Sequence, residues 1–246
     1  MYPVLFEIEF LKYFGIIRVQ SYYVFWSIAL ITAMIWTNRR TDRSDLPVRE
    51  VSSVISYAFI GMLLGARFFE YFANWQLYYK NPEYFLDINR GGISEVGATV
   101  AAIIVAYIMC KVKKISFWKL SDIVSPAALL TIAIGRWGCY LNGCCGGTGG
   151  HHVQLYYSLS AAIILAIVLA IENYNRRNGI VFKYGIISPI AVGLYSIIRL
   201  FIDQFRLEAD TEGIILSGKV LIVLAILSLA WFTVSIKNKE DKNEEF

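Results

Sequence analysis

Charged residues are scarce in this chain: Asp, Glu, Lys and Arg make up 17% of its 246 residues. Soluble domains usually carry about 25%. Hydrophobic residues account for 57%, and the mean hydropathy is +0.53. The shortage of charge argues against an ordinary soluble domain and predicts an integral membrane protein.

The chain also lacks a strong net charge, an internal repeat and a typical signal peptide, and each absence argues against a further class of protein. The formal net charge is only +4, so we expect no nucleic-acid partner. There is no internal repeat, which argues against a solute channel or transporter. The opening, MYPVLFEIEFLKYF, lacks the basic region and apolar run of a cleaved signal peptide. We expect residues 1–19 to form an interfacial segment on the membrane surface instead.

Seven apolar stretches have about the length that a membrane-spanning helix needs, roughly 20 residues. We therefore predict one all-α polytopic domain over residues 1–246 with seven transmembrane helices. The third stretch is short, and we expect it to begin near Ile93. The stretches are Gln20–Thr37, Val51–Phe72, Gly97–Cys110, Leu120–Leu141, Val153–Glu172, Tyr184–Phe205 and Gly213–Ile236.

Basic residues are concentrated in alternate connections between these stretches. Lys and Arg follow the first, third and fifth stretches and recur in the tail at 237–246, whereas residues 142–153 contain none. Because short cytoplasmic loops are enriched in Lys and Arg, the N-terminus is predicted outside and the C-terminus in the cytoplasm. Residues 73–96 and the Gly- and Cys-rich residues 142–152 then form outer loops.

Two arginines lie at matched depth in the predicted spans. Arg136 and Arg199 each follow a basic inner loop by about 25 Å of helix, at about 1.5 Å per residue, so both reach the outer half of the bilayer. Arg199 shares a helix face with Asp203, and Tyr195 is one turn away. Charged groups in spans are costly and usually face a partner inside the bundle.

Paired guanidinium groups predict a binding site for the phosphate of a phospholipid headgroup, because each planar fork can bind two oxygens. The alternative is structural: Arg199 and Asp203 form an internal tether, and Arg136 extends to the headgroup region.

Glycines fill the loop that follows Arg136, at 143, 146, 147, 149 and 150. Such a loop can adopt positive φ angles and bring backbone N–H groups close to a ligand. A flexible connector is the alternative.

Three cysteines, Cys139, Cys144 and Cys145, lie at the same outer end. A disulfide or simple packing is one interpretation. A thiolate activated by Arg136 is another, and a Zn²⁺ or copper site with His151 and His152 is a third. The spacing matches no standard metal motif, so we predict no metal and no cofactor. Cys110, near the inner end, is expected to be a buried small hydrophobe.

Several segments together resemble a known family. RVQSYYVF, GARFFEYF, INRGGISEVGA, LSDIVSPAALLTIAIGRWGCYLNG, HHVQLYY and YGIISPIAVGLYSIIRLFIDQFR are similar, in order, to the phosphatidylglycerol–prolipoprotein diacylglyceryl transferases. The resemblance covers almost the whole chain. It implies seven helices in the bacterial cytoplasmic (inner) membrane, with the active site toward the outer leaflet. It also implies transfer of a diacylglyceryl group from phosphatidylglycerol to a prolipoprotein lipobox cysteine, which forms a thioether and releases glycerol phosphate.

The resemblance also implies roles for individual residues. Arg136 and Arg199 fall on the two arginines that handle the lipid phosphate. Further residues fall on matching positions and are expected at the substrate: Tyr22, Asn142, Gly147, His151, Tyr195 and Asp203.

The chain departs from the family on the acceptor side. Val96 stands where the family has a histidine proposed as the base, and Cys139 and Cys144 replace a polar asparagine and a glutamate. Glu95, next to Val96, is a candidate substitute base. A covalent route through Cys139, Cys144 or Cys145 is the alternative. The catalytic candidates are therefore Tyr22, Glu95 and the three thiols.

Two further hypotheses keep the fold but change the function. The chain could be a family relative with another acceptor. It could also be an outer-face thiol, metal-binding or lipid-binding protein without transferase activity.

Overall fold

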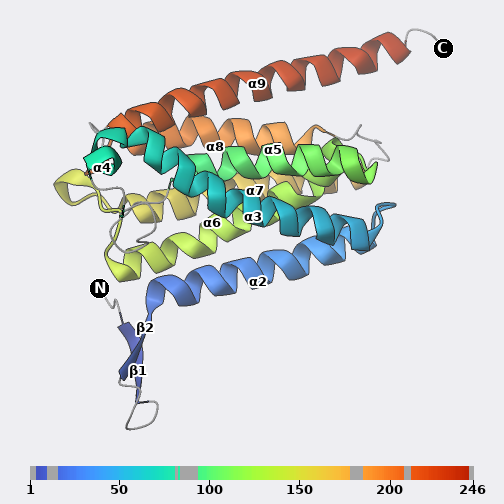
Figure 1. Ribbon diagram of the computed structural model, residues 1–246. Helices are drawn as coiled ribbons and strands as arrows, with labels where there is room; N and C mark the ends of the chain where they lie inside the picture. Colours follow the sequence, from blue (N-terminus) through green and yellow to red (C-terminus); the bar gives the residue numbers. More distant parts are fainter. Residues whose placement is uncertain are drawn as a thin grey trace.

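A computed structural model describes residues 4–9, 16–80, 83, 94–177, 185–207 and 212–243. Long helices dominate these residues and run beside one another, and the chain's C-terminal end lies opposite a small hairpin (Figure 1). The elements are β1 Val4–Glu9, β2 Ile16–Gln20, α2 Ser21–Asp42, α3 Val48–Ala73, α4 Trp75–Lys80, α5 Glu95–Lys113, α6 Phe117–Asn142, η2 Thr148–Gly150, α7 Val153–Arg177, α8 Ile187–Asp203 and α9 Glu212–Asn243.

Each of the seven predicted apolar stretches contains a helix, so the all-helical class is confirmed. Four helices, α3, α5, α6 and α7, are long and apolar enough to cross a membrane, and α9 holds a shorter apolar segment, Ile215–Trp231. The count of seven spans and the orientation of the termini stay predictions. The third helix begins at Glu95; Ile93 and Tyr184 lie outside the described residues.

Two short elements were not predicted from the sequence. Strands β1 and β2 form an antiparallel hairpin in which Glu7 is paired with Arg18 and Phe6 with Val19. Helix α4 lies within the predicted outer loop 73–96. Both elements lie at the end of the bundle where α6 finishes (Figure 1). The pairing of these strands does not test whether residues 1–19 lie on the membrane surface, so that location stays a prediction.

The outer surface of the bundle is strongly apolar. Large side chains such as Ile31, Leu64, Ile104, Leu159 and Ile226 are 53–61% exposed and come from five different helices. A soluble protein rarely exposes so much contiguous apolar surface. This surface is the one expected where lipid, rather than water, surrounds the helices.

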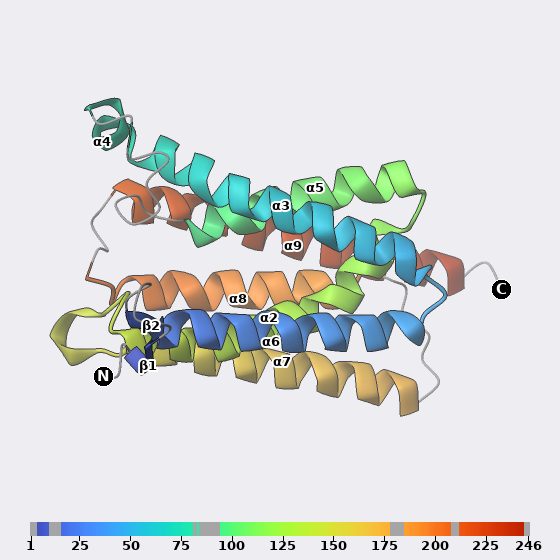
Figure 2. The same ribbon diagram turned by 60° about the horizontal axis from the view of Figure 1, so that its bottom comes forward.

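Helices α6, α7 and α8 enclose the main core. Leu129 on α6, Ala161 and Ile164 on α7, and Ala191 on α8 are buried against one another. Helix α2 packs on α6, and α3 pairs with α5 at the side of the bundle away from α7 (Figure 2). The core therefore fixes α8, which carries Arg199, against α6, which carries Arg136.

Polar contacts join α2 to α7 and α6 to α8 at the end of the bundle away from Arg136. Backbone N–H groups of Gly185 and Ser188 donate to the Asp122 carboxylate at 2.6 and 2.8 Å. Arg40 forms a two-pronged ion pair with Glu172, at 3.0 and 2.6 Å. The carboxylate satisfies the free N–H groups at the start of α8, so this helix is held to α6 well away from Arg199.

Helices α3 and α5 meet at two glycines. A Cβ added at Gly65 would lie 2.1 Å from the Cβ of Ala101, and one at Gly97 would lie 2.1 Å from the Cβ of Phe69. Only small residues allow two helix backbones this close. Because Glu95 begins α5 two residues before Gly97, this contact sets the position of the Glu95 side chain.

We predict that Gly65→Ala lowers the free energy of unfolding by about 1–3 kcal/mol, because the added methyl group forces α3 and α5 apart. Gly218→Ala is the matched control, since its Cβ would meet only Leu200 at an ordinary 3.8 Å. Unfolding in detergent, followed by circular dichroism, measures both variants. Equal stability of the two would contradict the close contact.

Candidate active site

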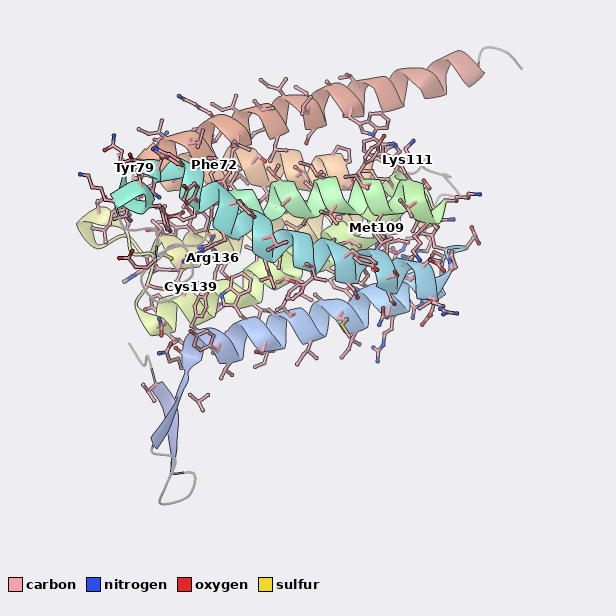
Figure 3. All side chains as sticks on the ribbon, in the orientation of Figure 1. Phe72, Tyr79, Met109, Lys111, Arg136 and Cys139 are labelled. Carbon is pink, nitrogen blue, oxygen red and sulfur yellow. The ribbon has the colours of Figure 1, made fainter. Side chains whose placement is uncertain are left out.

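The predicted site residues gather at one end of the bundle. Arg136 and Cys139 lie toward the end that carries the hairpin and α4, whereas Met109 and Lys111 lie toward the other end (Figure 3). The basic connections that follow α2 and α5 and the predicted site are therefore at opposite ends of the bundle, as the sequence predicts.

Glu95 joins the two arginines. One Glu95 oxygen, Oε2, accepts a hydrogen bond from Nη2 of Arg136, and the other, Oε1, forms an ion pair with Nη1 of Arg199 at 2.8 Å. The side chains of both arginines are only 5% exposed, while that of Glu95 is 30% exposed. The alternative in which Arg136 extends to the headgroups is wrong, because this guanidinium points inward to Glu95.

Tyr195 and Asp203 complete the arrangement on α8. The Tyr195 hydroxyl donates to Oε1 of Glu95 at 3.2 Å. Asp203 lies 3.5 Å from Nε of Arg199, so the predicted pairing one turn apart is confirmed as a loose ion pair. Arg136, Arg199, Glu95 and Asp203 form a compact cluster with two positive and two negative charges, and the charge of Arg206 also acts on Glu95.

Tyr157 on α7 lies beneath both arginines, which the sequence analysis missed. Its ring centroid is 4.4 Å from Cζ of Arg136 and 5.7 Å from Cζ of Arg199. Its hydroxyl donates to Asp203. A cation over an aromatic face is stabilised electrostatically, so Tyr157 supports both guanidinium groups. The sequence does place Tyr157 four residues from both Val153 and Ala161, on the same buried face of α7, and this spacing could have indicated that it points into the bundle.

Two donors in this cluster, Nε of Arg136 and Nε of Arg199, make no hydrogen bond to the described residues. Both are buried. A buried polar group without a partner is costly. Arg136 therefore retains capacity to bind an anionic ligand beyond its contact with Glu95.

The glycine-rich loop is packed against the segment that follows α8. The N–H of Thr148 donates to the Phe205 carbonyl at 2.9 Å, and the N–H of Leu207 donates to the Gly146 carbonyl at 3.2 Å. A Cβ at Gly147 would lie 2.5 Å from the His151 carbonyl and 2.8 Å from that of Phe205. The predicted glycine at 147 is thus required for packing, and the loop is an ordered wall beside α8 rather than a loose connector.

Cys139, Cys144 and Cys145 lie close together as free thiols. Cys139 is buried, Cys144 is half-buried, and Cys145 is exposed at a positive φ of 57°. Hydrogen bonds from the Cys139 and Cys144 thiols, with the charges of Arg136 and Arg206, hold the pKa of Cys145 below its usual range. Among the described residues, no three His, Cys, Asp or Glu side chains are arranged to hold a metal ion.

The remaining predicted residues are divided between the thiols and the loop. Tyr22 lies within electrostatic reach of the three thiols and of Arg136, and the side chain of Asn142 hydrogen-bonds Cys144. His151 instead pairs with Tyr156, at 3.1 Å between Nδ1 and the hydroxyl oxygen, and its ring contacts Phe205. No recorded contact in the described ranges joins His151 to the arginines.

Comparison with known sequences identifies the family. The sequence profile of the prolipoprotein diacylglyceryl transferases matches residues 9–236. The chain belongs to this family. It is 26% identical to the phosphatidylglycerol–prolipoprotein diacylglyceryl transferase of Finegoldia magna, covering 94% of this chain and 96% of that protein. The Clostridium novyi enzyme of that name is 28% identical, covering 97% and 98%.

In this member of the diacylglyceryl transferase family, the second residue of α5 is the apolar Val96. Val96 is buried, at 3% exposure, and carries no group that could accept a proton. Its neighbour Glu95 is the acidic residue that reaches the arginine cluster. The role of Glu95 as a substitute for the base stays a prediction.

We predict that Cys145 is alkylated first by iodoacetamide, ahead of buried Cys110 and Cys139. Because the pKa of Cys145 is lowered by its thiol neighbours and by Arg136 and Arg206, its labelling rate is expected to fall by clearly less than tenfold per pH unit between pH 8 and 6. An ordinary thiol, with a pKa of about 8.5, loses roughly tenfold in rate per unit.

Mass spectrometry of briefly labelled protein measures this rate, with Cys145→Ser as the control. A tenfold loss of rate per pH unit would contradict the lowered pKa. Labelling that appears only after addition of a reductant would favour the disulfide interpretation.

Proposed function

We propose that this chain transfers the diacylglyceryl group of phosphatidylglycerol to the cysteine thiol of a prolipoprotein. The observation that carries the proposal is the convergence of two buried guanidinium groups, Arg136 and Arg199, on one carboxylate. Family membership and the printed names of the relatives from Finegoldia magna and Clostridium novyi support the reaction and both substrates.

The two arginines would hold the phosphate of the donor lipid. In the reaction, the acceptor sulfur forms a bond to the glyceryl carbon while the bond between this carbon and the phosphate oxygen breaks. The electron pair of the broken bond goes to the phosphate, so negative charge builds on the leaving glycerol phosphate. Guanidinium groups already fixed by Tyr157 and the core would stabilise that charge without having to reorganise.

The other predicted residues are assigned by where they lie. Asp203 and Tyr195 would position Arg199 and the headgroup from α8, and the loop with Gly147 and His151 would form one wall of the headgroup site. Tyr22, Cys139 and Cys145 interact electrostatically with Arg136, and Asn142 hydrogen-bonds the neighbouring Cys144. We assign them to the side that receives the acceptor.

The membrane arrangement is also a proposal. All seven long helices would span the bacterial cytoplasmic membrane, with the N-terminus outside and the C-terminus in the cytoplasm. The basic loops support this orientation, as does their position at the end opposite Arg136 (Figure 3). The site would then open to the outer leaflet, where both the donor headgroup and an exported prolipoprotein are accessible.

Arg136→Gln is expected to lower the transfer rate by about 10²–10³-fold, because it removes a positive group from the leaving phosphate. The assay uses purified protein, labelled phosphatidylglycerol and a lipobox peptide. Arg39→Gln is the matched control, since Arg39 is exposed at the far end of α2.

Full transfer by Arg136→Gln at normal protein level would rule out the phosphate clamp. Lipid binding by the wild type without any labelled peptide would favour the lipid-binding alternative.

A further inference from the structure

Glu95 occupies the place that the proposed function gives to the donor phosphate. Its two carboxylate oxygens are divided between Arg136 and Arg199, the same two groups that would bind the two non-bridging oxygens of a phosphodiester. A carboxylate and a phosphodiester each offer two oxygens and one negative charge to a guanidinium. Substrate and side chain therefore compete for one pair of cations.

Charge also opposes their simultaneous binding. Arg136 and Arg199 are already balanced by Glu95 and Asp203 within a buried cluster. A phosphodiester added beside Glu95 and Asp203 would face two like charges, and this repulsion is costly in a buried site even though the charge of Arg206 also acts there. Movement of the Glu95 carboxylate away from the arginines lowers that cost.

The structure allows Glu95, rather than the arginines, to move. Its side chain is 30% exposed, against 5% for each arginine. The backbone beside it is fixed: the N–H of Ser94 donates to the Ala66 carbonyl at 3.1 Å, and the Ser94 hydroxyl accepts from the N–H of Gly97. A rotation of the Glu95 side chain alone would release the site.

We propose that the donor phosphate displaces the Glu95 carboxylate from Arg136 and Arg199, and that the released Glu95 is the base for the acceptor thiol. This inference rests on the proposed function and adds a base that Val96 cannot provide. A carboxylate paired with two guanidinium groups is a poor proton acceptor, whereas a released one is a better acceptor. Binding of the donor lipid thus activates the base.

The step balances in atoms and charge. The thiol proton goes to Glu95, the sulfur–carbon bond forms, and the carbon–oxygen bond to phosphate breaks with its electron pair on the oxygen. Before the step, the phosphodiester and Glu95 each carry one negative charge. After the step, Glu95 is neutral and glycerol phosphate carries two. When the product leaves with the proton or passes it to water, Glu95 returns to the arginines.

The exchange predicts an obligatory order in which phosphatidylglycerol binds before the thiol is deprotonated. It also predicts opposite effects on the two kinetic constants when Glu95 is changed. Removing its charge relieves the competition, so the donor binds more tightly. Removing its basicity slows the chemical step. A purely structural ion pair would weaken binding and stability together.

The experiment measures kcat and the KM for phosphatidylglycerol with full-length protein in nanodiscs and a lipobox peptide. For Glu95→Gln we expect kcat to fall by about 10²–10⁴-fold and KM to fall by about tenfold, as expected for loss of a competing buried charge. Glu50→Gln is the matched control. It removes an ion pair with Lys113, at 3.0 Å, where the start of α3 meets the end of α5, far from Glu95. The control is expected to change neither constant.

Glu95→Asp keeps the negative charge and serves where Glu95→Gln does not accumulate. Its shorter side chain fits the two arginines less well, so KM is expected to fall while transfer persists at a reduced kcat. An unchanged or raised KM in the Glu95 variants overturns the exchange, and an unchanged kcat in Glu95→Gln overturns the base.

Failure of the proposed function gives a different result. In that case the wild-type protein transfers nothing to the peptide. Equilibrium binding of phosphatidylglycerol then still tests the exchange: tighter binding by Glu95→Gln than by the wild type supports it, and equal or weaker binding overturns it.

Discussion

Two guanidinium groups buried side by side at one end of a membrane bundle are the constraint on which the rest of this structure depends. Like charges this close repel, and a charge removed from water is costly unless it is paired. Glu95, Asp203 and the face of Tyr157 meet that cost from three different helices, α5, α8 and α7. Buried ion pairs of this kind are weak evidence for stability, and they leave Nε of both arginines without a hydrogen bond among the described residues.

The scaffold explains why these groups meet. The glycine contact between α3 and α5 brings the start of α5 to the arginines. The Asp122 carboxylate fixes the beginning of α8 at the far end of the bundle, and the apolar core between α6, α7 and α8 keeps the two arginine-bearing helices in register. The site is therefore set by packing and hydrogen bonds distributed along the full length of the helices.

The sequence predicted the parts of this picture that periodicity and charge encode. The lengths of the apolar stretches predicted the seven helices. The number of residues between each arginine and the preceding basic loop predicted that Arg136 and Arg199 lie at one level, which their shared contact with Glu95 confirms. Sequence reasoning could not find the N-terminal hairpin, because its apolar residues also fit an interfacial segment. It also missed Tyr157, since an aromatic residue on a buried helix face gives no sign of the cations that pack on it. For Glu95, the sequence indicated a carboxylate next to the position of the family's base. It did not indicate that this carboxylate forms ion pairs with both arginines.

The central claim is that the arginines hold the donor phosphate and that Glu95 must leave for it to bind. The most direct test is an experimental structure of the full chain in a nanodisc containing phosphatidylglycerol. We expect the lipid phosphate between Arg136 and Arg199, with hydrogen bonds to both guanidinium groups and the Glu95 carboxylate turned away from them. A bound headgroup elsewhere, with both contacts of Glu95 intact, would contradict it.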